Sequence, residues 1–309
     1  MKPYTFSVIV PLYNKQNEIG DTLRSILAQR YLPLEVVVVN DGSTDGSADV
    51  VRSFDSPLIR LITQPNAGEC AARNRAIAEA RGEYLALLDA DDTWDPGYLE
   101  EIARLIDRYP GCGMYSTAFH IVSREGVFPS HSPKEEGVVD NFFRQSLNYY
   151  VSIPSTSTIP AFVFKEVGGF PEGMRMGGDQ YMWVKIARRY PVCFSPKRLL
   201  NYSLVASNRS AAIYTPESTP YSFREFYDPQ GDFYLNEYLA RVELGKALTL
   251  SAKGGTEVGR SAERFYRYTR CNRRAWYKLW VLNRIPMPLR AWVFRQYNRL
   301  AWKLAKKGL

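Results

Sequence analysis

Tyr84-Leu85-Ala86-Leu87-Leu88-Asp89-Ala90-Asp91-Asp92 is the stretch that decides the fold, because an apolar run ends there in three carboxylates. Residues 84–88 predict a core strand of the kind that lies at the centre of a parallel sheet. In open α/β sheets ligands bind beyond the carboxyl ends of the strands, so the aspartates are expected beside a cleft. On extended backbone Asp89 and Asp91 would point to the same side, where like charges are costly unless a cation joins them. Carboxylate oxygens suit Mg²⁺ or Mn²⁺.

The same stretch also fits a solvated loop that leads into the next helix. Asp95 and Pro96 suit the N-cap and the first turn of a helix. Because Asp-x-Asp alone is a common pattern, the rest of the chain has to decide between a metal site and a loop.

Strand and helix patterns alternate over the first 120 residues. Further short apolar strands are expected at residues 7–10, 34–39 and 58–62, and helices at residues 19–27, 45–54, 68–80 and 99–109. This repetition predicts an α/β fold, a mainly parallel sheet with helices on both sides. Right-handed crossovers would bring the segments that follow the strands to one edge. Those segments are polar, as expected of a binding cleft.

The rest of the chain has other patterns. Residues 121–175 are richer in Pro, Ser and Gly, and Phe162-Val163-Phe164 predicts a strand. From about residue 215 onward the periodicity is helical, without strands. We therefore expect one domain over residues 1–214 and a helical C-terminal extension over residues 215–309.

Composition limits the class of protein. Of the 309 residues, 45% are hydrophobic and 23% are charged, which describes a globular chain that can bury a core. The four cysteines are far apart and show neither disulfide nor metal-ligand spacing, which favours a reduced, cytoplasmic compartment. A strand is expected close to the first residue, so we expect no signal peptide. No run of 18 apolar residues occurs, so no membrane span is predicted.

The basic charge is concentrated near the C-terminus. Residues 260–309 hold 14 Lys or Arg and one acid, Glu263, so this segment carries a charge of +13. Because the net charge of the whole chain is +8, the other residues together carry −5. Pro286 and Pro288 divide this segment into two predicted helices. Four of the six tryptophans lie in it: Trp276, Trp280, Trp292 and Trp302.

The second of these helices has a regular apolar stripe between basic residues. The stripe consists of Leu289, Val293, Tyr297, Leu300 and Leu304. A basic amphipathic helix with tryptophans fits the surface of an anionic bilayer. Nucleic acid would also attract its charge, but nothing else in the chain indicates base reading, so no nucleic-acid partner is expected. The alternative is that the stripe packs on the preceding domain.

Five motifs follow one another along the first hundred residues. They are Val10-Pro11-Leu12-Tyr13-Asn14, Asn40-Asp41-Gly42-Ser43-Thr44-Asp45, Asn66-Ala67-Gly68, Ala72-Arg73-Asn74 and Asp89-Ala90-Asp91-Asp92. Together they resemble the family-2 glycosyltransferases of GT-A fold, and the similarity covers about residues 5–205. The resemblance implies a Rossmann-like, mixed, mainly parallel sheet. Its nucleotide-binding half would span about residues 1–120, and its acceptor half about residues 121–214.

The resemblance also implies a nucleotide-sugar site. Asp41 would accept the imide N–H of a uracil or thymine base, and Pro11 and Tyr13 would flank that base. Glu18 and Asn66 are assigned to the same site. The alternative is a turn, because the segment Asp41-Gly42-Ser43-Thr44-Asp45-Gly46 consists of residues that commonly form turns. For Asp45 we favour this turn and helix-cap role.

The diphosphate end of that site would involve Arg73 and the aspartates. A guanidinium is a natural partner of a diphosphate, although a structural ion pair is the alternative for Arg73. The resemblance implies that Asp89 contacts the ribose and that Asp91 holds Mn²⁺ or Mg²⁺, with Asp92 sharing or replacing Asp91. Such a metal would neutralise the charge that builds on the leaving nucleoside diphosphate.

The family places its general base in a pair of acids that open a helix after a Gly-Gly-Phe segment. Here Gly168-Gly169-Phe170 is followed by Gly178-Asp179, so Asp179 is the candidate base. A helix N-terminus favours its ionised form, although a simple N-cap carboxylate is the alternative. Gly178 stands where the family usually has the first acid, which weakens any role that needs two carboxylates.

The chain is therefore predicted to be an inverting, metal-dependent glycosyltransferase. It would move a sugar from a nucleotide sugar, with UDP favoured, to a glycan or lipid-linked saccharide in bacterial-type surface polysaccharide synthesis. It is expected in the cytoplasm or peripherally on the inner face of the membrane. The alternatives are a degenerate, membrane-docked nucleotide-sugar-binding protein and a nucleotidyltransferase. A nucleotidyltransferase would normally have a Gly-rich, basic loop after its first strand, and Tyr13-Asn14-Lys15-Gln16-Asn17 is not such a loop. Since neither membrane spans nor a Gln-x-x-Arg-Trp motif are found, transfer of one sugar, or few, is expected.

Overall fold

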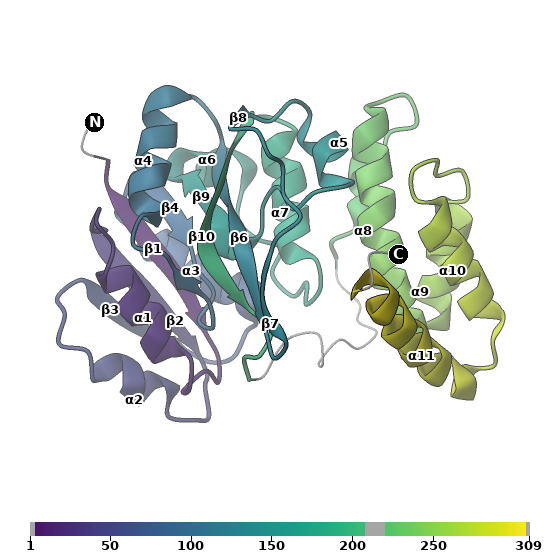
Figure 1. Cartoon of the computed structure of the whole chain (residues 1–309), viewed down its shortest axis with the longest axis horizontal. Helices are drawn as coiled ribbons and strands as arrows, with labels where there is room; N and C mark the ends of the chain where they lie inside the picture. The colour runs from purple at the N-terminus through teal and green to yellow at the C-terminus, as the bar shows by residue number, and fades with distance from the viewer. Residues whose placement is uncertain (1–3, 208–219, 307–309) are drawn as a thin grey trace. The chain divides into compact units, whose positions relative to one another are not determined.

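The computed structural model describes residues 4–207 and 220–306, with side chains as far as residue 296. The chain forms two compact units, Met1–Arg209 and Ser210–Leu309. The boundary predicted between residues 214 and 215 lies outside the described residues. Figure 1 labels most of the elements of both units.

A mixed, mainly parallel sheet forms the centre of the first unit (Figure 1). Its strand order is β3-β2-β1-β4-β9-β6-β10-β5, and β7 and β8 pair with β6 and β10. The four parallel strands of the half predicted to bind the nucleotide are β1 (Phe6–Leu12), β2 (Glu35–Asp41), β3 (Ile59–Gln64) and β4 (Tyr84–Leu87). They correspond to the four predicted strands, so the predicted fold class is confirmed.

The other half of the sheet mixes strand directions. β9 (Ser157–Pro160) runs antiparallel between β4 and β6 (Met114–Ser123), whereas β10 (Val192–Ser203) runs parallel to β6. The short strands β5 (Thr93–Trp94), β7 (Gly126–Pro129) and β8 (Gly137–Val138) are antiparallel to their partners. Because two reversals separate β4 from β6, the carboxyl ends of β1, β4, β6 and β10 reach the same edge of the sheet.

Helices cover both faces of the sheet because the strand residues alternate between them. Phe6, Val8 and Val10 of β1 pack in one core with α1 (Ile19–Leu27) and α4 (Tyr98–Arg108). Ile9 is equally buried but points to the opposite face, where α3 (Glu69–Glu79) packs against β1 and β2. The remaining helical segments of this unit are α2 (Ser47–Arg52), α5 (Phe142–Ser146), η1 (Pro154–Thr156), α6 (Ala161–Val167) and α7 (Gly178–Ala187).

The strand predicted at Phe162-Val163-Phe164 was wrong, because these residues lie in helix α6. Val163, Phe164 and Val167 are buried, whereas Phe162 is half exposed, which is a helical and not an alternating pattern. The true strand is β9, directly before it. A short apolar run does not distinguish a strand from a buried helical turn.

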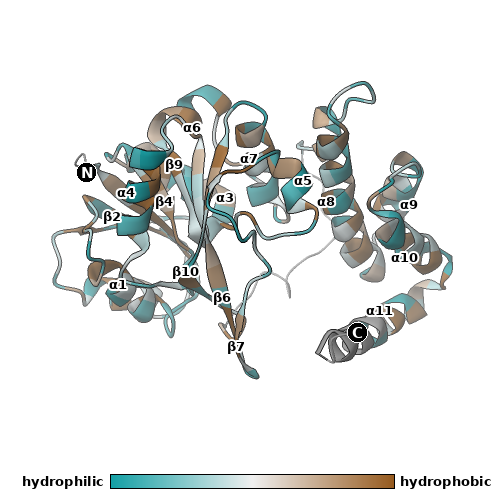
Figure 2. Cartoon of the chain, turned by 45° about the horizontal axis from the view of Figure 1, so that its top comes forward, coloured by the Kyte–Doolittle hydropathy of each residue, from teal (hydrophilic) through white to brown (hydrophobic). Residues whose placement is uncertain are grey.

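The second unit is helical in the part of the chain that is described, as the periodicity predicted. It contains η3 (Phe223–Phe226), α8 (Phe233–Ala252), α9 (Thr256–Phe265), α10 (Arg273–Arg284) and α11 (Met287–Lys306). Pro286 separates α10 from α11, and Pro288 is tolerated in the first turn of α11, where no intrahelical N–H bond is lost. Hydrophobic and hydrophilic residues both occur along α8, α9 and α10 (Figure 2). No described helix is long and apolar enough to cross a bilayer.

Candidate functional site

The polar segments that follow β1, β2 and β4 meet at one edge of the sheet. Asn14, after β1, donates its backbone N–H to Ser43 Oγ at 3.0 Å and accepts the N–H of Thr44 through Oδ1 at 2.8 Å. Lys15 Nζ lies 2.8 Å from Asp91 Oδ2, in the segment after β4. The loops that the sequence placed together are therefore in direct contact.

Asp41, the last residue of β2, is 3% exposed and ties the next loop to this edge. Its Oδ1 accepts the backbone N–H of Ala67 at 2.9 Å and the side-chain amide of Gln64 at 2.8 Å, and its Oδ2 accepts the N–H of Gly68 at 2.8 Å. A carboxylate offers about four acceptor positions, so room for one further donor remains. Asp41 therefore serves the turn in any case, and its contact with a base stays a prediction.

Of the other residues assigned to the base, Asn66 contacts Asp41, and Pro11 lies in β1, which pairs with β2. Asn66 donates its side-chain N–H to the carbonyl of Asp41 at 2.9 Å. Gly42, at φ +71°, lets the Asn66 loop approach, because a Cβ at residue 42 would lie 2.8 Å from the Asn66 backbone nitrogen. Pro11 is partly buried in β1, and Tyr13 just beyond it is 38% exposed. The ring of Tyr13 is therefore accessible to a ligand.

Arg73 is deeply buried in α3 and is held by two acids. Its Nη2 lies 2.6 Å from Asp89 Oδ1 and forms an ion pair with Glu69, and its guanidinium faces the ring of Phe170 at 5.4 Å. Its Nε has no hydrogen-bond partner. This geometry favours the ion-pair interpretation of Arg73, in which the guanidinium positions Asp89.

Glu69 was not among the predicted site residues. It lies four residues before Arg73, which is the spacing of an ion pair on a helix, and its side chain is half exposed. The charge of Arg73 has the largest influence on the pKa of Glu69 and lowers it. Burial and the charges of Asp89, Asp179 and Asp91 together outweigh Arg73 and raise that pKa to about 7. The i,i+4 spacing of Glu69 and Arg73 is the signal in the sequence that could have identified this pair.

Asp179 lies in the first turn of α7, which Gly177 precedes in a left-handed conformation at φ +87°. Burial raises the pKa of Asp179, and the charge of Arg73 opposes this rise. The predicted base therefore belongs to the same electrostatic group as Arg73. A carboxylate whose pKa is raised towards the working pH is a stronger proton acceptor than an ordinary aspartate.

The structure gives a steric reason for the glycine at residue 178. A Cβ there would lie 2.5 Å from Cys70 Sγ, well inside contact distance. Cys70 is buried in α3 and occupies the space that a side chain at residue 178 would need. The contact also places Glu69, the neighbour of Cys70, beside the start of α7.

Asp91 and Asp92 differ in environment. Asp92 is 1% exposed; its Oδ2 accepts Ser155 Oγ–H at 2.5 Å and its Oδ1 accepts the Ser203 N–H at 2.9 Å. Asp91 contacts Lys15 instead, and burial, with the charge of Asp89, raises the pKa of Asp91. Of the two candidate ligands, Asp91 fits a cation and Asp92 is committed to holding η1 and the end of β10.

A divalent cation at Asp91 would need further oxygen ligands. Within the described part of the chain, no group of three or more His, Cys, Asp or Glu side chains could hold a metal ion. Mg²⁺ is commonly bound through one or two carboxylates together with substrate phosphates. The single carboxylate of Asp91 fits that mode of binding.

Glu18 lies at the start of α1, beside the segment that follows β10. Its Oε1 accepts the N–H of Ser207 at 2.7 Å, whereas its Oε2 is buried without a hydrogen-bond partner. One acceptor of Glu18 is therefore unsatisfied near the candidate donor site.

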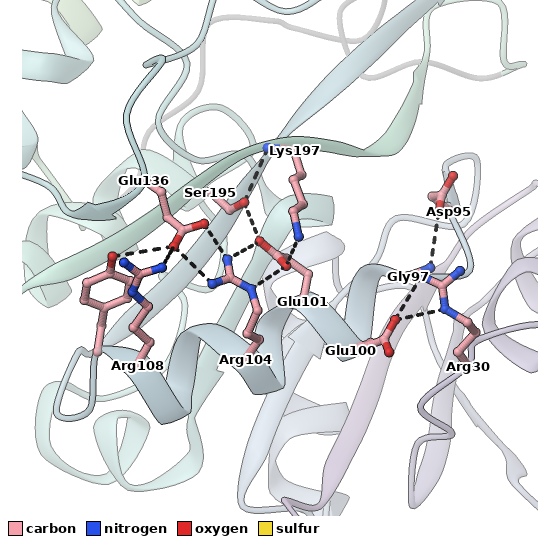
Figure 3. A network of polar contacts seen from close by, with 11 residues as sticks. Arg30, Asp95, Gly97, Glu100, Glu101, Arg104, Arg108, Glu136, Ser195 and Lys197 are labelled. Carbon is pink, nitrogen blue, oxygen red and sulfur yellow. Dashed lines mark hydrogen bonds and ion pairs between the residues drawn. The ribbon is translucent and has the colours of Figure 1, made fainter. Parts of the chain in front are cut away.

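A second cluster of charges ties α4 to β10 (Figure 3). Glu101, which is 4% exposed, accepts Arg104 Nη2 at 2.7 Å, Lys197 Nζ at 2.7 Å and Ser195 Oγ at 2.6 Å. Glu136 pairs with Arg104 and with Arg108. Burial raises the pKa of Glu101, but the hydrogen bonds of Arg104, Lys197 and Ser195 outweigh it and lower that pKa to about 2.

A cavity of about 200 Å³ adjoins this cluster. It is lined by Arg30, Gly97, Glu100, Glu101, Arg104, Lys197 and Leu199. Its charged groups already form ion pairs with one another, since Arg30 contacts Glu100 at 2.9 Å. Nothing in the motif pattern of the sequence predicted this cluster.

Residues 7–176 match the family model described as glycosyl transferase family 2. The chain is also similar to TuaG of Bacillus subtilis, a protein named for teichuronic acid biosynthesis, with 28% identity over 222 residues, 67% of this chain and 83% of TuaG. Over 98 residues it is 41% identical to the uncharacterized glycosyltransferase YibD of Escherichia coli K12, and over 127 residues 37% identical to glycosyltransferase GlyA of Streptococcus pneumoniae. These matches cover 31% and 40% of this chain, but only 28% of YibD and 18% of GlyA.

The fold is similar to that of Staphylococcus aureus TarS. A crystal structure of TarS residues 1–349 with UDP-GlcNAc aligns with a TM-score of 0.61 and 22% identity, over 87% of this chain and 74% of that one. The motifs, the family match and the sheet topology agree, and the chain belongs to the family 2 glycosyltransferases, as a glycosyltransferase of GT-A fold.

Proposed function

We propose that the chain is an inverting glycosyltransferase that moves one sugar, or few, from a nucleoside-diphosphate sugar to a saccharide or lipid-linked saccharide. The observation that carries this proposal is the group of acids around Arg73 at the carboxyl edge of the sheet: Glu69, Asp89 and Asp179. UDP is the favoured nucleotide, since TarS has been crystallised with UDP and with UDP-GlcNAc. The name of TuaG supports a role in bacterial surface polysaccharide synthesis.

In this proposal the nucleotide lies along the ends of β1, β2 and β4. Asp41 accepts the imide N–H of the base through its remaining acceptor position, and the exposed ring of Tyr13 stacks on the base next to Pro11. Asn66 and Glu18 line the same edge. Asp89, held in place by Arg73, accepts a ribose hydroxyl.

Asp91 would hold Mn²⁺ or Mg²⁺ together with the diphosphate. A bound divalent cation neutralises the charge that develops on the leaving nucleoside diphosphate. We assign Asp92 a supporting role, because both of its oxygens already accept hydrogen bonds inside the protein.

Asp179 would act as the general base. An acceptor hydroxyl attacks the sugar carbon from the side opposite the leaving diphosphate, and its proton passes to the Asp179 carboxylate. The raised pKa of Asp179 and its place in the first turn of α7 support this role. A single carboxylate is sufficient for this proton transfer, so Gly178 does not argue against it.

A screen of nucleotide sugars with Mn²⁺ tests the proposal. A nucleotide sugar that binds the folded state raises the melting temperature, and slow hydrolysis of that donor to free nucleoside diphosphate reports catalysis. Stabilisation by a UDP- or dTDP-sugar with hydrolysis supports a transferase. Stabilisation without hydrolysis or transfer would instead favour a nucleotide-sugar-binding protein, and release of pyrophosphate from a nucleoside triphosphate would favour a nucleotidyltransferase.

We further propose that the helical unit contacts an anionic membrane surface. Met287, Leu289 and Trp292 at the start of α11 are each more than half exposed. Arg290, between them, is buried and donates to the carbonyls of Asn283 and Ile285, which fixes this end of α11 on its own unit. Tyr297, Leu300 and Leu304 of the predicted stripe lie outside the described side chains. Exposed aromatic and aliphatic groups beside basic residues suit the interface of an anionic bilayer.

A further inference from the structure

Lys15 is a cation that the protein itself brings to Asp91. Its Nζ lies 2.8 Å from Asp91 Oδ2 and also donates to the carbonyl of Ser207. The side chains of Lys15 and Asp91 are only 11% and 17% exposed, so water screens their attraction weakly. The backbone N–H of Lys15 donates to Ser47 Oγ at 2.7 Å, which fixes the residue independently of its ammonium group.

The surroundings of this ion pair are strongly acidic. Asp89, Glu69 and Asp179 belong to the same electrostatic group, and among the described residues Arg73 is the cation that forms ion pairs in it, with Glu69 and with Asp89. The Asp91 carboxylate can therefore pair with either of two cations, the ammonium of Lys15 or a divalent ion.

We propose that Lys15 and a divalent cation compete for the Asp91 carboxylate, and that a nucleoside diphosphate relieves this competition. The inference rests on the proposed function, because it needs a diphosphate at this edge. Phosphate oxygens supply ligands for the divalent ion and at the same time a new anionic partner for the displaced ammonium. Lys15 thus makes the metal bind weakly alone and strongly with the nucleotide.

Positive coupling between metal and nucleotide is the thermodynamic consequence. If the nucleotide raises the affinity for the metal by a given factor, the metal raises the affinity for the nucleotide by the same factor. Part of that factor is the cost of displacing Lys15, and this part disappears when the ammonium is removed. Lys15 would then disfavour metal binding at Asp91 unless the nucleoside diphosphate is also bound.

Lys15→Met removes the charge and keeps most of the stem. The segment after β10 stays attached in this variant, because Ser203 still donates to Asp92 and Ser207 still donates to Glu18. Lys165→Met, at an exposed position of α6, is the matched control. Asp91→Asn in the Lys15→Met background tests that any gain in metal affinity uses Asp91.

The measurement is Mn²⁺ affinity, followed by electron paramagnetic resonance of free Mn²⁺, with and without UDP or dTDP. We expect Lys15→Met to bind Mn²⁺ about tenfold more tightly than wild type without nucleotide, and to lose a similar factor from a coupling that is typically about 5- to 150-fold. Lys165→Met should match wild type, and Asp91→Asn should remove the gain.

Equal Mn²⁺ affinity of wild type and Lys15→Met in the absence of nucleotide would overturn the inference, as would a gain that survives Asp91→Asn. These results leave the proposed function untouched as long as wild type binds UDP or dTDP. The absence of binding of either nucleotide to wild type would overturn the proposed function, whatever Lys15→Met does to the Mn²⁺ affinity.

Discussion

Two groups of acids in the first unit contain the same kinds of residue and behave in opposite ways. In the α4 network (Glu101, Arg104, Arg108, Glu136, Lys197), the cations outnumber the acids, and the pKa of Glu101 falls to about 2. In the Arg73 group (Glu69, Asp89, Asp91 and Asp179 with Arg73 and Lys15), four acids face two cations, and the pKa values of Glu69, Asp91 and Asp179 are raised.

The difference lies in whether the charges are balanced within the protein. The α4 network pairs both of its acids, Glu101 and Glu136, with cations and so fixes α4 on β10, which is a structural role. The Arg73 group carries uncompensated negative charge in a partly desolvated place, which costs stability and is offset when a cation or a proton arrives. Acids left in this condition at the ligand-binding edge of an α/β sheet are those expected to bind and react.

Replacing the proposed base should have the largest effect. Asp179→Asn keeps the size of the side chain and removes its basicity, so we expect turnover to fall by roughly 10²- to 10⁴-fold with donor affinity preserved. Single-turnover transfer to an identified acceptor is the measurement. A loss below about tenfold would place the base elsewhere and remove Asp179 from the reactive group.

Asp41→Ala should weaken nucleotide binding at the opposite end of the site. Loss of one hydrogen bond to a charged acceptor is worth about 1.5–3 kcal/mol, or about 10- to 150-fold in affinity. The loss should be similar with and without Mn²⁺, because the contact is to the base. If calorimetry gives wild-type affinity for both UDP and dTDP, Asp41 serves only the turn that holds Ala67 and Gly68.

Glu101→Gln and Glu69→Gln should differ in how they change stability with pH. Because the folded pKa of Glu101 is lowered, its contribution is present above the unfolded pKa of about 4.5 and is lost as pH falls towards 2. Glu101→Gln should therefore cost about 2 kcal/mol near neutral pH, as expected when one partner of a buried ion pair is removed.

Glu69 has the opposite sign, because its folded pKa is raised to about 7. The folded state then binds more protons than the unfolded state between pH 4.5 and 7, so this residue's contribution is lost as pH rises through that range. At pH 8 Glu69→Gln should be at least as stable as wild type. Urea unfolding at pH 5 and pH 8 measures both variants, and equal pH dependence of the two would show that the two groups of acids do not differ in charge balance.

The smallest effect is expected at the start of α11. Leu289→Ser with Trp292→Ser removes exposed apolar groups, so the fold should keep its stability while binding to anionic liposomes weakens several-fold. Co-sedimentation at low and high salt separates the apolar part of the binding from the electrostatic part. If the full-length protein does not sediment with liposomes, the membrane proposal is wrong.

The arrangement of the parallel strands β1 to β4 could be predicted from the sequence. Buried runs such as Val36–Val39 predict central strands, and polar segments directly after them must meet at one edge when the strands are parallel. The prediction failed at Phe162-Val163-Phe164, where three apolar residues fit a strand and a helical turn equally well. Only Gly168, which ends α6 at φ +77°, and the pairing of β9 distinguish the two.

Details of the site depend on contacts between distant residues, which a pattern does not reveal. Asp91 and Asp92 are neighbours in the same motif, and only Ser155 and Ser203, 63 and 111 residues away, draw Asp92 inward. Lys15 reaches Asp91 across 76 residues. The glycine at residue 178 reads as a missing acid in the sequence, whereas the structure relates it to the volume of Cys70.

The most direct test of the central claim is calorimetric titration of UDP into wild type and Asp91→Ala, each with Mn²⁺ and with EDTA. We expect Mn²⁺ to strengthen UDP binding to wild type and Asp91→Ala to lose this strengthening, while its affinity in EDTA is at least that of wild type, because Asp91 no longer holds Lys15. The fold should be unchanged, because a carboxylate at the edge of the sheet contributes little to the core. Equal Mn²⁺ dependence of the two proteins would contradict the assignment of the acids of the Arg73 group to donor and metal binding.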